Sequence, residues 1–174
     1  MARGKLAIGL DIGSTSVKMI QLKESRRRGE AVYSLLNFGM KPLPPEAIVD
    51  NALMNSTAIV QAIQELIGEL RIKQKETAIS VSGHSVIIKK IQMPQMSSAE
   101  LDESIQWEAE QYIPFDVKDV NIDTQILSTD AGAATGQMDV LLVAAKKDMI
   151  NDYTTVVTEA PALISTTVSL SATS

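Results

Sequence analysis

Hydrophobic and polar positions alternate over the first stretch of the chain, in a pattern that predicts β-structure. Residues 6–12 form a short apolar run with branched side chains, and residues 16–23 alternate apolar with polar positions. A polar segment, Gly-Ser-Thr at 13–15, joins the two runs. Apolar runs of period two joined by a short glycine-containing segment are typical of a β-hairpin. We therefore expect two antiparallel strands at the start of the fold.

The next segments are predicted to add a strand to this hairpin and then a helix that packs on the resulting sheet. A third apolar run spans 31–38, after an arginine-rich tip at 26–29, and prolines at 42, 44 and 45 end it. From 57 to 71 apolar residues recur at helical spacing, with glutamine and glutamate opposite them, which predicts an amphipathic helix. Residues 77–82 form the next predicted strand. The expected order is strand, strand, strand, helix, strand.

A second unit is predicted to begin near residue 84. Ser97 and Glu100 form a capping box ahead of its first helix, where acidic side chains also favour the helix dipole. The predicted elements are a strand at 86–93, a helix at 98–112, strands at 120–128 and 138–145, and a helix at 146–159. We expect three segments: a first subdomain at 1–83, a second at 84–160, and an atypical tail at 161–174 that has no charged residue.

The amino-acid composition excludes several classes of protein and of functional site. The 174 residues carry 16 basic and 21 acidic side chains, a net charge of −5, which argues against a protein that coats nucleic acid. There is no cysteine and one histidine, which excludes disulfides, a thiol nucleophile and any metal site that needs two imidazoles. No apolar run approaches the ~18 residues of a membrane-spanning helix, and the start does not resemble a signal peptide. We expect a soluble cytoplasmic protein.

Residues 11–18, Asp-Ile-Gly-Ser-Thr-Ser-Val-Lys, have the chemistry of a phosphate site. Gly13 allows close approach of the backbone, the hydroxyls of Ser14 and Thr15 donate to phosphate oxygens, and Lys18 adds positive charge. Asp11 would hold Mg²⁺ through water, since a carboxylate repels phosphate directly. The alternative is an ordinary hairpin turn followed by an exposed lysine. The pattern is neither a Walker A loop nor a dinucleotide fingerprint.

Two motifs carry a resemblance to a known family. Residues 11–18 resemble the first phosphate motif of the actin-like ATPases, which include sugar kinases, heat-shock chaperones and FtsA. Residues 107–115, Trp-Glu-Ala-Glu-Gln-Tyr-Ile-Pro-Phe, resemble the signature of the PilM family of the type IV pilus machinery, and Ile-Gln-Met-Pro at 91–94 also matches. The likeness covers roughly 5–160, and the nine-residue motif is the more specific of the two.

This resemblance implies an α/β fold: the first half of an actin-like (ribonuclease-H-like) ATPase, with 84–160 as an inserted FtsA-type 1C subdomain. It implies ATP and Mg²⁺ as ligands of the complete protein, and at most a weak ATPase activity. Actin-like proteins close the nucleotide between two domains, so a chain of this length is expected to hold half of the site. The expected location is the cytoplasm beneath the inner membrane, in pilus assembly and motility.

The resemblance also implies a role as an assembly scaffold. The expected partner is the cytoplasmic N-terminal segment of PilN, together with other pilus motor and alignment proteins and a possible homo-oligomer or ring. From the two-subdomain organisation we expect a crevice between the units, where an extended segment pairs with a strand edge. The residues expected to form or support this site are Val86, Ile87, Ile88, Ile91, Trp107 and Tyr112. We expect Trp107 to brace the corner at 112–115, with a role as a partner anchor as the alternative.

Two other functions stay open at this point. One is an actin-like enzyme such as a sugar kinase, which needs a catalytic carboxylate in a second domain. The other is a peptide-binding adaptor with no nucleotide role. The sequence offers no catalytic residue: His84 is expected to be a loop residue because no nucleophile elbow accompanies it. The second Asp-x-Gly, at Asp130, is expected to be a hairpin turn, and the arginines at 26–28 a solvated tip.

Overall fold

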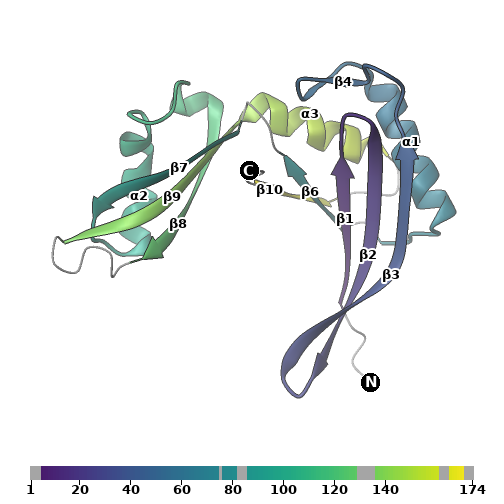
Figure 1. Ribbon diagram of the computed structural model, residues 1–174, viewed down its shortest axis with the longest axis horizontal. Helices are drawn as coiled ribbons and strands as arrows, with labels where there is room; N and C mark the ends of the chain where they lie inside the picture. Colours follow the sequence, from purple (N-terminus) through teal and green to yellow (C-terminus); the bar gives the residue numbers. More distant parts are fainter. Residues whose placement is uncertain (1–4, 75, 82–85, 129–135, 161–164, 171–174) are drawn as a thin grey trace. The chain divides into compact units, whose positions relative to one another are not determined.

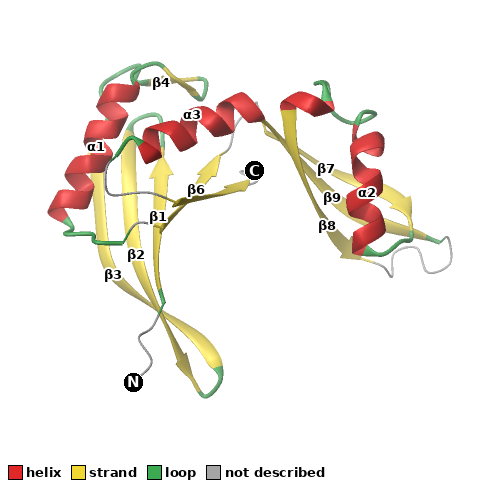
Figure 2. Ribbon diagram, turned by 180° about the vertical axis from the view of Figure 1, so that it is seen from behind, coloured by secondary structure: helices red, strands yellow, loops and turns green. Residues whose placement is uncertain are grey.

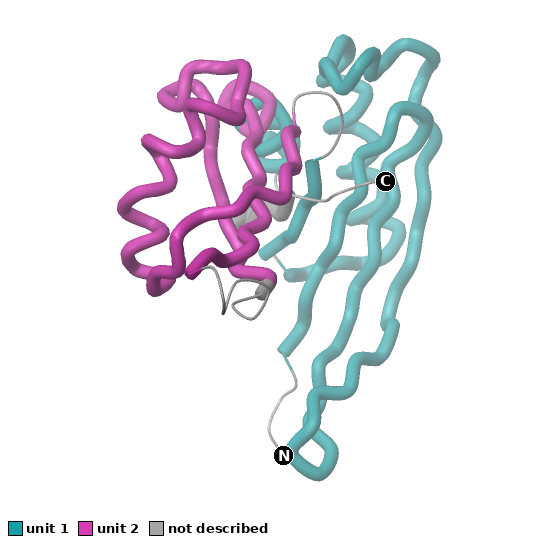
Figure 3. Tube along the Cα trace, turned by 60° about the vertical axis from the view of Figure 1, so that its left-hand side comes forward, with its two compact units in different colours: residues 1–81, 151–171 teal, residues 82–150, 172–174 magenta. Residues whose placement is uncertain are grey.

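The chain forms two compact units, each with its own sheet. The computed structural model describes residues 5–74, 76–81, 86–128, 136–160 and 165–170 (Figure 1). One unit comprises residues 1–81 with 151–171, and the other comprises 82–150 with 172–174 (Figure 3). Helix α3 (Lys147–Thr158) begins in the second unit and continues into the first.

The first unit is built on a five-stranded mixed sheet with the order β10-β6-β1-β2-β3. The antiparallel pairs are β1 with β2 and β2 with β3, whereas β1 with β6 and β6 with β10 are parallel. The bounds are β1 Leu6–Ile12, β2 Ser16–Arg27, β3 Glu30–Pro42, β6 Glu76–Val81 and β10 Ser165–Leu170. The predicted hairpin at 6–23 is confirmed, and the predicted three strands, helix and strand occur in the expected order, with a short hairpin between the third strand and the helix.

Helix α1 (Ser56–Glu69) covers one face of this sheet. The Asn55 side chain caps it by accepting a hydrogen bond from the Ala58 amide at 3.0 Å, as a helix N-cap should. Its buried stripe consists of Ile59, Ala62, Ile63, Leu66 and Ile67. Residues 151–158 of α3 lie on the same side of the sheet (Figure 2). Strands β4 (Ile48–Val49) and β5 (Ala52–Leu53), which the sequence did not predict, form a small hairpin before α1.

The opposite face of the β1–β2–β3 layer is open in the described part of the unit. Several large apolar side chains of the edge strand β3 are exposed to solvent: Tyr33, Leu35, Leu36, Phe38 and Met40. Gly39 faces the other way, toward α1, where a Cβ atom would lie 2.8 Å from Leu66 Cδ2. The absence of a side chain at Gly39 therefore allows α1 to pack closely on β3.

The second unit is a three-stranded antiparallel sheet with one helix packed on it. The strand order is β7-β9-β8, and the bounds are β7 Val86–Pro94, β8 Val120–Ser128 and β9 Gln137–Lys146. Helix α2 (Ser98–Ala109) contributes Leu101, Ile105 and Ala109 to a core with the inward residues of the strands. The predicted capping box is confirmed, because Ser97 Oγ accepts from the Glu100 amide and Glu100 Oε2 accepts from the Ser97 amide.

The end of the chain differs from the sequence expectation. Residues 165–170, expected to belong to an irregular tail, form β10 and extend the first sheet beside β6. Strand pairing is a long-range interaction, so the serine- and threonine-rich composition of this segment gave no indication of it. On the C-terminal side the two units divide after Ile150, inside α3, and not at residue 160. The expected boundary at 83–84 lies outside the described residues.

We predict that Gly39→Val lowers the free energy of unfolding by about 1–3 kcal/mol, because the new side chain overpacks the contact with α1. Urea denaturation monitored by circular dichroism measures this change. Gly68→Ala is the control: no atom lies within 4 Å of its added Cβ, and it should leave stability unchanged or slightly higher. An unchanged urea midpoint for Gly39→Val would show that α1 does not pack closely against β3 at this position.

We also predict that the α2 capping box makes stability depend on acid pH. The Ser97 amide and hydroxyl donate to Glu100 and lower the pKa of its carboxyl below the ordinary value of 4.5. This contribution is fully present above pH 4.5 and is lost as the pH falls through the lowered pKa. Glu100→Gln should therefore weaken stability at pH 7 more than at pH 3 in thermal melts. Glu103→Gln, on the same helix, is the control, and an equal effect of Glu100→Gln at both pH values would contradict the prediction.

Candidate functional site

The predicted phosphate-site residues cluster at the turn between β1 and β2. In the strand register Asp11 lies opposite Lys18, and Lys18 Nζ is 3.0 Å from Asp11 Oδ2. Both side chains are about half exposed, at 58% and 45%. Ser14 and Thr15 are exposed at the turn itself. The structure thus brings all five residues, including Gly13, to one end of the hairpin.

The backbone of this turn is well fixed. The Gly13 amide donates to the Ser16 carbonyl at 3.0 Å, which closes the turn. The Leu43 amide donates to the Thr15 carbonyl at 2.8 Å and ties the turn to the segment after β3. A Cβ atom on Gly13 would meet only the Ser16 carbonyl oxygen, at an ordinary 3.4 Å. The fold itself therefore tolerates a small side chain at Gly13, and its absence leaves the turn open to solvent.

The donor set at this turn fits a phosphate with a bound Mg²⁺. Two hydroxyls and one ammonium group are exposed together, and a carboxylate lies beside them, which is the chemistry that phosphate and hydrated Mg²⁺ respectively require. An exposed ion pair contributes only about 0–1 kcal/mol to stability. The Asp11–Lys18 pair can therefore exchange its partners for a ligand at little cost to the fold.

A shallow depression of about 380 Å³ adjoins the ion pair on the open face of the sheet. Its walls are the Asp11–Lys18 pair together with Gly9, Ile20, Phe38, Ala78 and Ser80. Sequence analysis did not find this feature, because it needs β6, β1, β2 and β3 to lie side by side. Periodicity marks which face of each strand is apolar, but it does not give the strand order.

The six predicted partner-site residues do not lie on one surface of the second unit. Ile91 is buried in its core, and Ile87 and Tyr112 pack against that core. Val86 and Ile88 have the opposite parity on β7 and lie on the sheet face away from α2, where both are half-buried. Val86 and Ile88 are therefore the predicted residues of β7 that are placed to contact a partner directly.

Trp107 is 77% exposed on α2, so the expectation that it braces the 112–115 corner is wrong. Its position is nearly opposite the buried stripe of the helix, which points it to solvent. Tyr112 and Phe115 pack against the core without it. Lys146 Nζ lies 4.3 Å from the centre of the Phe115 ring and stabilises this corner instead.

Lys41, Glu65 and Glu69 form an ion-pair cluster with a structural role. Lys41 Nζ binds Glu65 at 3.1 Å and Glu69 at 2.5 Å, which joins the end of β3 to α1. Glu69 and Glu65 together raise the pKa of Lys41. No cluster of three or more metal-ligating side chains occurs in the described ranges. His84 and the turn at Asp130 lie outside the described residues. No helix that the structure describes is long and apolar enough to cross a membrane.

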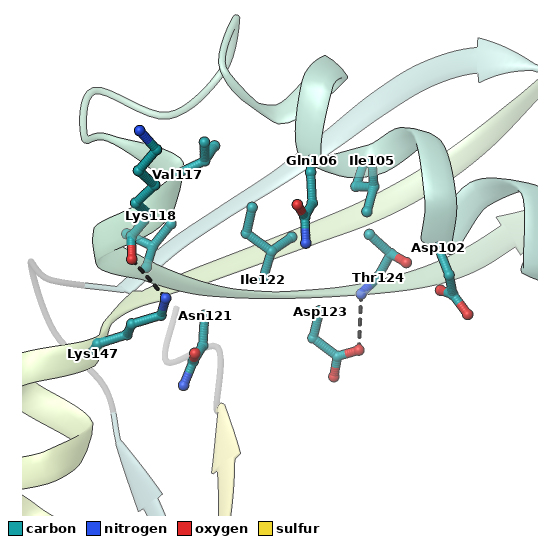
Figure 4. A pocket seen from close by; sticks show the side chains of 11 residues that line it. Asp102, Ile105, Gln106, Val117, Lys118, Asn121, Ile122, Asp123, Thr124 and Lys147 are labelled. Atoms are coloured by element: carbon teal, nitrogen blue, oxygen red, sulfur yellow. Dashed lines mark hydrogen bonds between the residues drawn. The ribbon is translucent and has the colours of Figure 1, made fainter.

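A groove with a volume of about 610 Å³ is lined entirely by residues of the second unit (Figure 4). It runs along the edge strand β8 beside α2 and the 3-10 helix η1 (Val117–Asp119). No local pattern in the sequence indicates this groove, because it forms between segments that are distant along the chain. The charged residues that line it are Asp102, Lys118, Asp123 and Lys147.

Comparison with known proteins identifies the family. A family model described as "Type IV pilus assembly protein PilM" matches residues 9–169, which is most of the chain. The chain belongs to the PilM family of type IV pilus assembly proteins. The resemblance to this family, drawn from the motifs at 91–94 and 107–115, is thereby confirmed.

Two solved structures show the same fold. The PilM–PilN type IV pilus biogenesis complex matches with a TM-score of 0.77 and 27% identity, over 94% of this chain and 47% of that one. The cytoplasmic domain of EpsL, an inner-membrane component of the Vibrio cholerae type II secretion system, matches with a TM-score of 0.55 and 13% identity, over 95% of this chain and 57% of that one. The chain thus spans about half the length of these proteins, and their match agrees with the mixed α/β fold that the sequence predicts.

Proposed function

We propose that this PilM-family chain is an assembly scaffold that binds the cytoplasmic N-terminal segment of PilN. The observation that carries the proposal is the 27% identity, at a TM-score of 0.77, to a PilM solved in complex with PilN. Through such a partner the protein would act at the inner membrane, in the cytoplasm.

The β7 edge supports binding of an extended segment. In the second unit β7 pairs only with β9 among the described strands, so its outer edge is available. A peptide that pairs with an edge strand gains backbone hydrogen bonds, and alternate side chains supply specificity. Val86 and Ile88 lie at the start of this edge, beside the half-buried Val143 of β9. We propose that this unit is the FtsA-type 1C subdomain.

The second part of the proposal is nucleotide binding at the β1–β2 turn. Gly13, Ser14, Thr15 and Lys18 would hold the phosphates, and Asp11 would hold Mg²⁺ through water. Two observations support this proposal. The side chain of Lys18 is exposed beside the turn. The fold would tolerate a Cβ atom at Gly13, so packing does not explain the glycine at this position. Since the chain corresponds to about half of the solved PilM, we propose that it holds half of the site.

The proposed PilN site predicts that a synthetic copy of the PilN N-terminal segment binds this chain in the absence of ATP. Ile88→Ser should weaken the binding at least tenfold in fluorescence anisotropy, because it removes an apolar contact from the β7 edge. Leu127→Ser, an exposed leucine on the opposite edge strand, is the control and should bind as the parent does. Equal affinities of the Ile88→Ser variant and the parent would refute the β7 assignment.

The nucleotide part predicts weak binding of MgATP, in the millimolar range. Amide resonances of residues 13–15 and 18 should shift during an NMR titration, and Gly13→Val should abolish these shifts because its side chain blocks the approach to the turn. Asp11→Asn should remove the dependence on Mg²⁺. Gly68→Ala serves as the control. Micromolar affinity would contradict the half-site, and unchanged shifts in Gly13→Val would contradict the location.

A further inference from the structure

The groove along β8 combines a free strand edge with an apolar floor. In the described sheet β8 pairs with β9 alone, so its other edge borders the groove. Ile105 of α2 and Ile122 of β8 line the groove, and their side chains lie between the helix and the strand (Figure 4). An edge with unpaired backbone groups next to an apolar slot is the arrangement that accepts an added strand.

The backbone of β8 shows which of its residues face the groove. The Thr124 amide donates to its neighbour Asp123 Oδ1 at 2.9 Å, so this N–H points to the free edge and not toward β9. Residues two apart in a strand point their backbone groups the same way. The N–H and carbonyl groups of Val120 and Ile122 therefore face the same free edge as those of Thr124.

The groove has opposite charges at its two ends. Lys118 and Lys147 line the end where β8 begins, and Lys147 Nζ donates to the Lys118 carbonyl at 2.6 Å. Asp102 of α2 and Asp123 line the other end. At ~3.3 Å per residue, Asp123 and the start of β8 are separated by roughly three to four residues of extended chain.

We infer that the β8 edge binds an extended segment of another protein, antiparallel to β8, with a basic residue followed four positions later by an acidic one. The basic residue would lie at the Asp102–Asp123 end and the acidic residue at the lysine end. Two apolar residues between them, of the opposite parity, would pack on Ile122 and Ile105. The amide of Thr124, now held by the carboxylate of Asp123, would bond to the incoming strand. This site is separate from the β7 edge and does not depend on the proposed PilN site.

The test uses the 174-residue chain and a capped synthetic heptapeptide, Thr-Lys-Val-Thr-Val-Glu-Thr. Isothermal titration calorimetry should show it binding at least tenfold tighter than the same peptide with lysine and glutamate exchanged. In the double variant Asp123→Lys with Lys147→Glu the preference should reverse. Lys89→Glu with Glu110→Lys, a charge exchange outside the groove, should keep the original preference.

Backbone pairing is tested with N-methylated peptides. In the antiparallel register both valine amides face β8, so N-methylation of the valines should abolish binding. N-methylation of the central threonine, whose amide faces away, should leave the affinity unchanged. Absence of binding, equal affinity for the two charge orders, or tolerance of the N-methylated valines would each overturn the inference. Concentration-dependent broadening of β8 resonances without peptide would assign the edge to a second copy of this chain and would overturn it as well.

Discussion

The register between β1 and β2 is the constraint on which the rest of the first unit depends. Because side chains alternate along a strand, a slip of one residue would move every apolar side chain from one face to the other. In the observed register Leu10 lies opposite Met19, both buried under the helices, and Asp11 lies opposite Lys18 on the open face. Burial of the core therefore also forms the ion pair at the candidate phosphate site.

The same alternation explains how the exposed turn at the candidate phosphate site is supported by buried residues. The turn itself is exposed, but its closing residues Ile12 and Val17 are buried, and the Leu43 amide holds the Thr15 carbonyl. A ligand that displaced the exposed Asp11–Lys18 pair would leave these buried contacts intact. The buried core and the candidate phosphate site thus lie on opposite faces of one hairpin.

The second unit is subject to a different constraint, because a small sheet leaves strand edges with unpaired backbone groups. Three strands and one helix bury one sheet face, and in the described chain both β7 and β8 remain edge strands. Natural proteins protect such edges or use them for binding. On β8 the carboxylate of Asp123 accepts a hydrogen bond from an edge amide, and charged residues line the groove beside it. Charged side chains of this kind oppose unspecific pairing of an edge strand.

The sequence by itself determined those secondary-structure elements that depend on interactions between residues close along the chain. Periodicity located both helices of the core, the β1–β2 hairpin and the capping box, because each depends on residues that are close along the chain. The motifs at 91–94 and 107–115 also indicated the family, because a specific string of residues can be recognised without knowledge of its surroundings.

Only the tertiary structure decided the features that join distant segments. The strand at 165–170 forms because β6 offers it a parallel edge, and nothing within its own composition shows that partner. The exposure of Trp107, the burial of Ile91 and the groove along β8 likewise depend on which surfaces α2 and the sheet bury together. Local patterns give the apolar face of each element, whereas the packing of elements determines what each face meets.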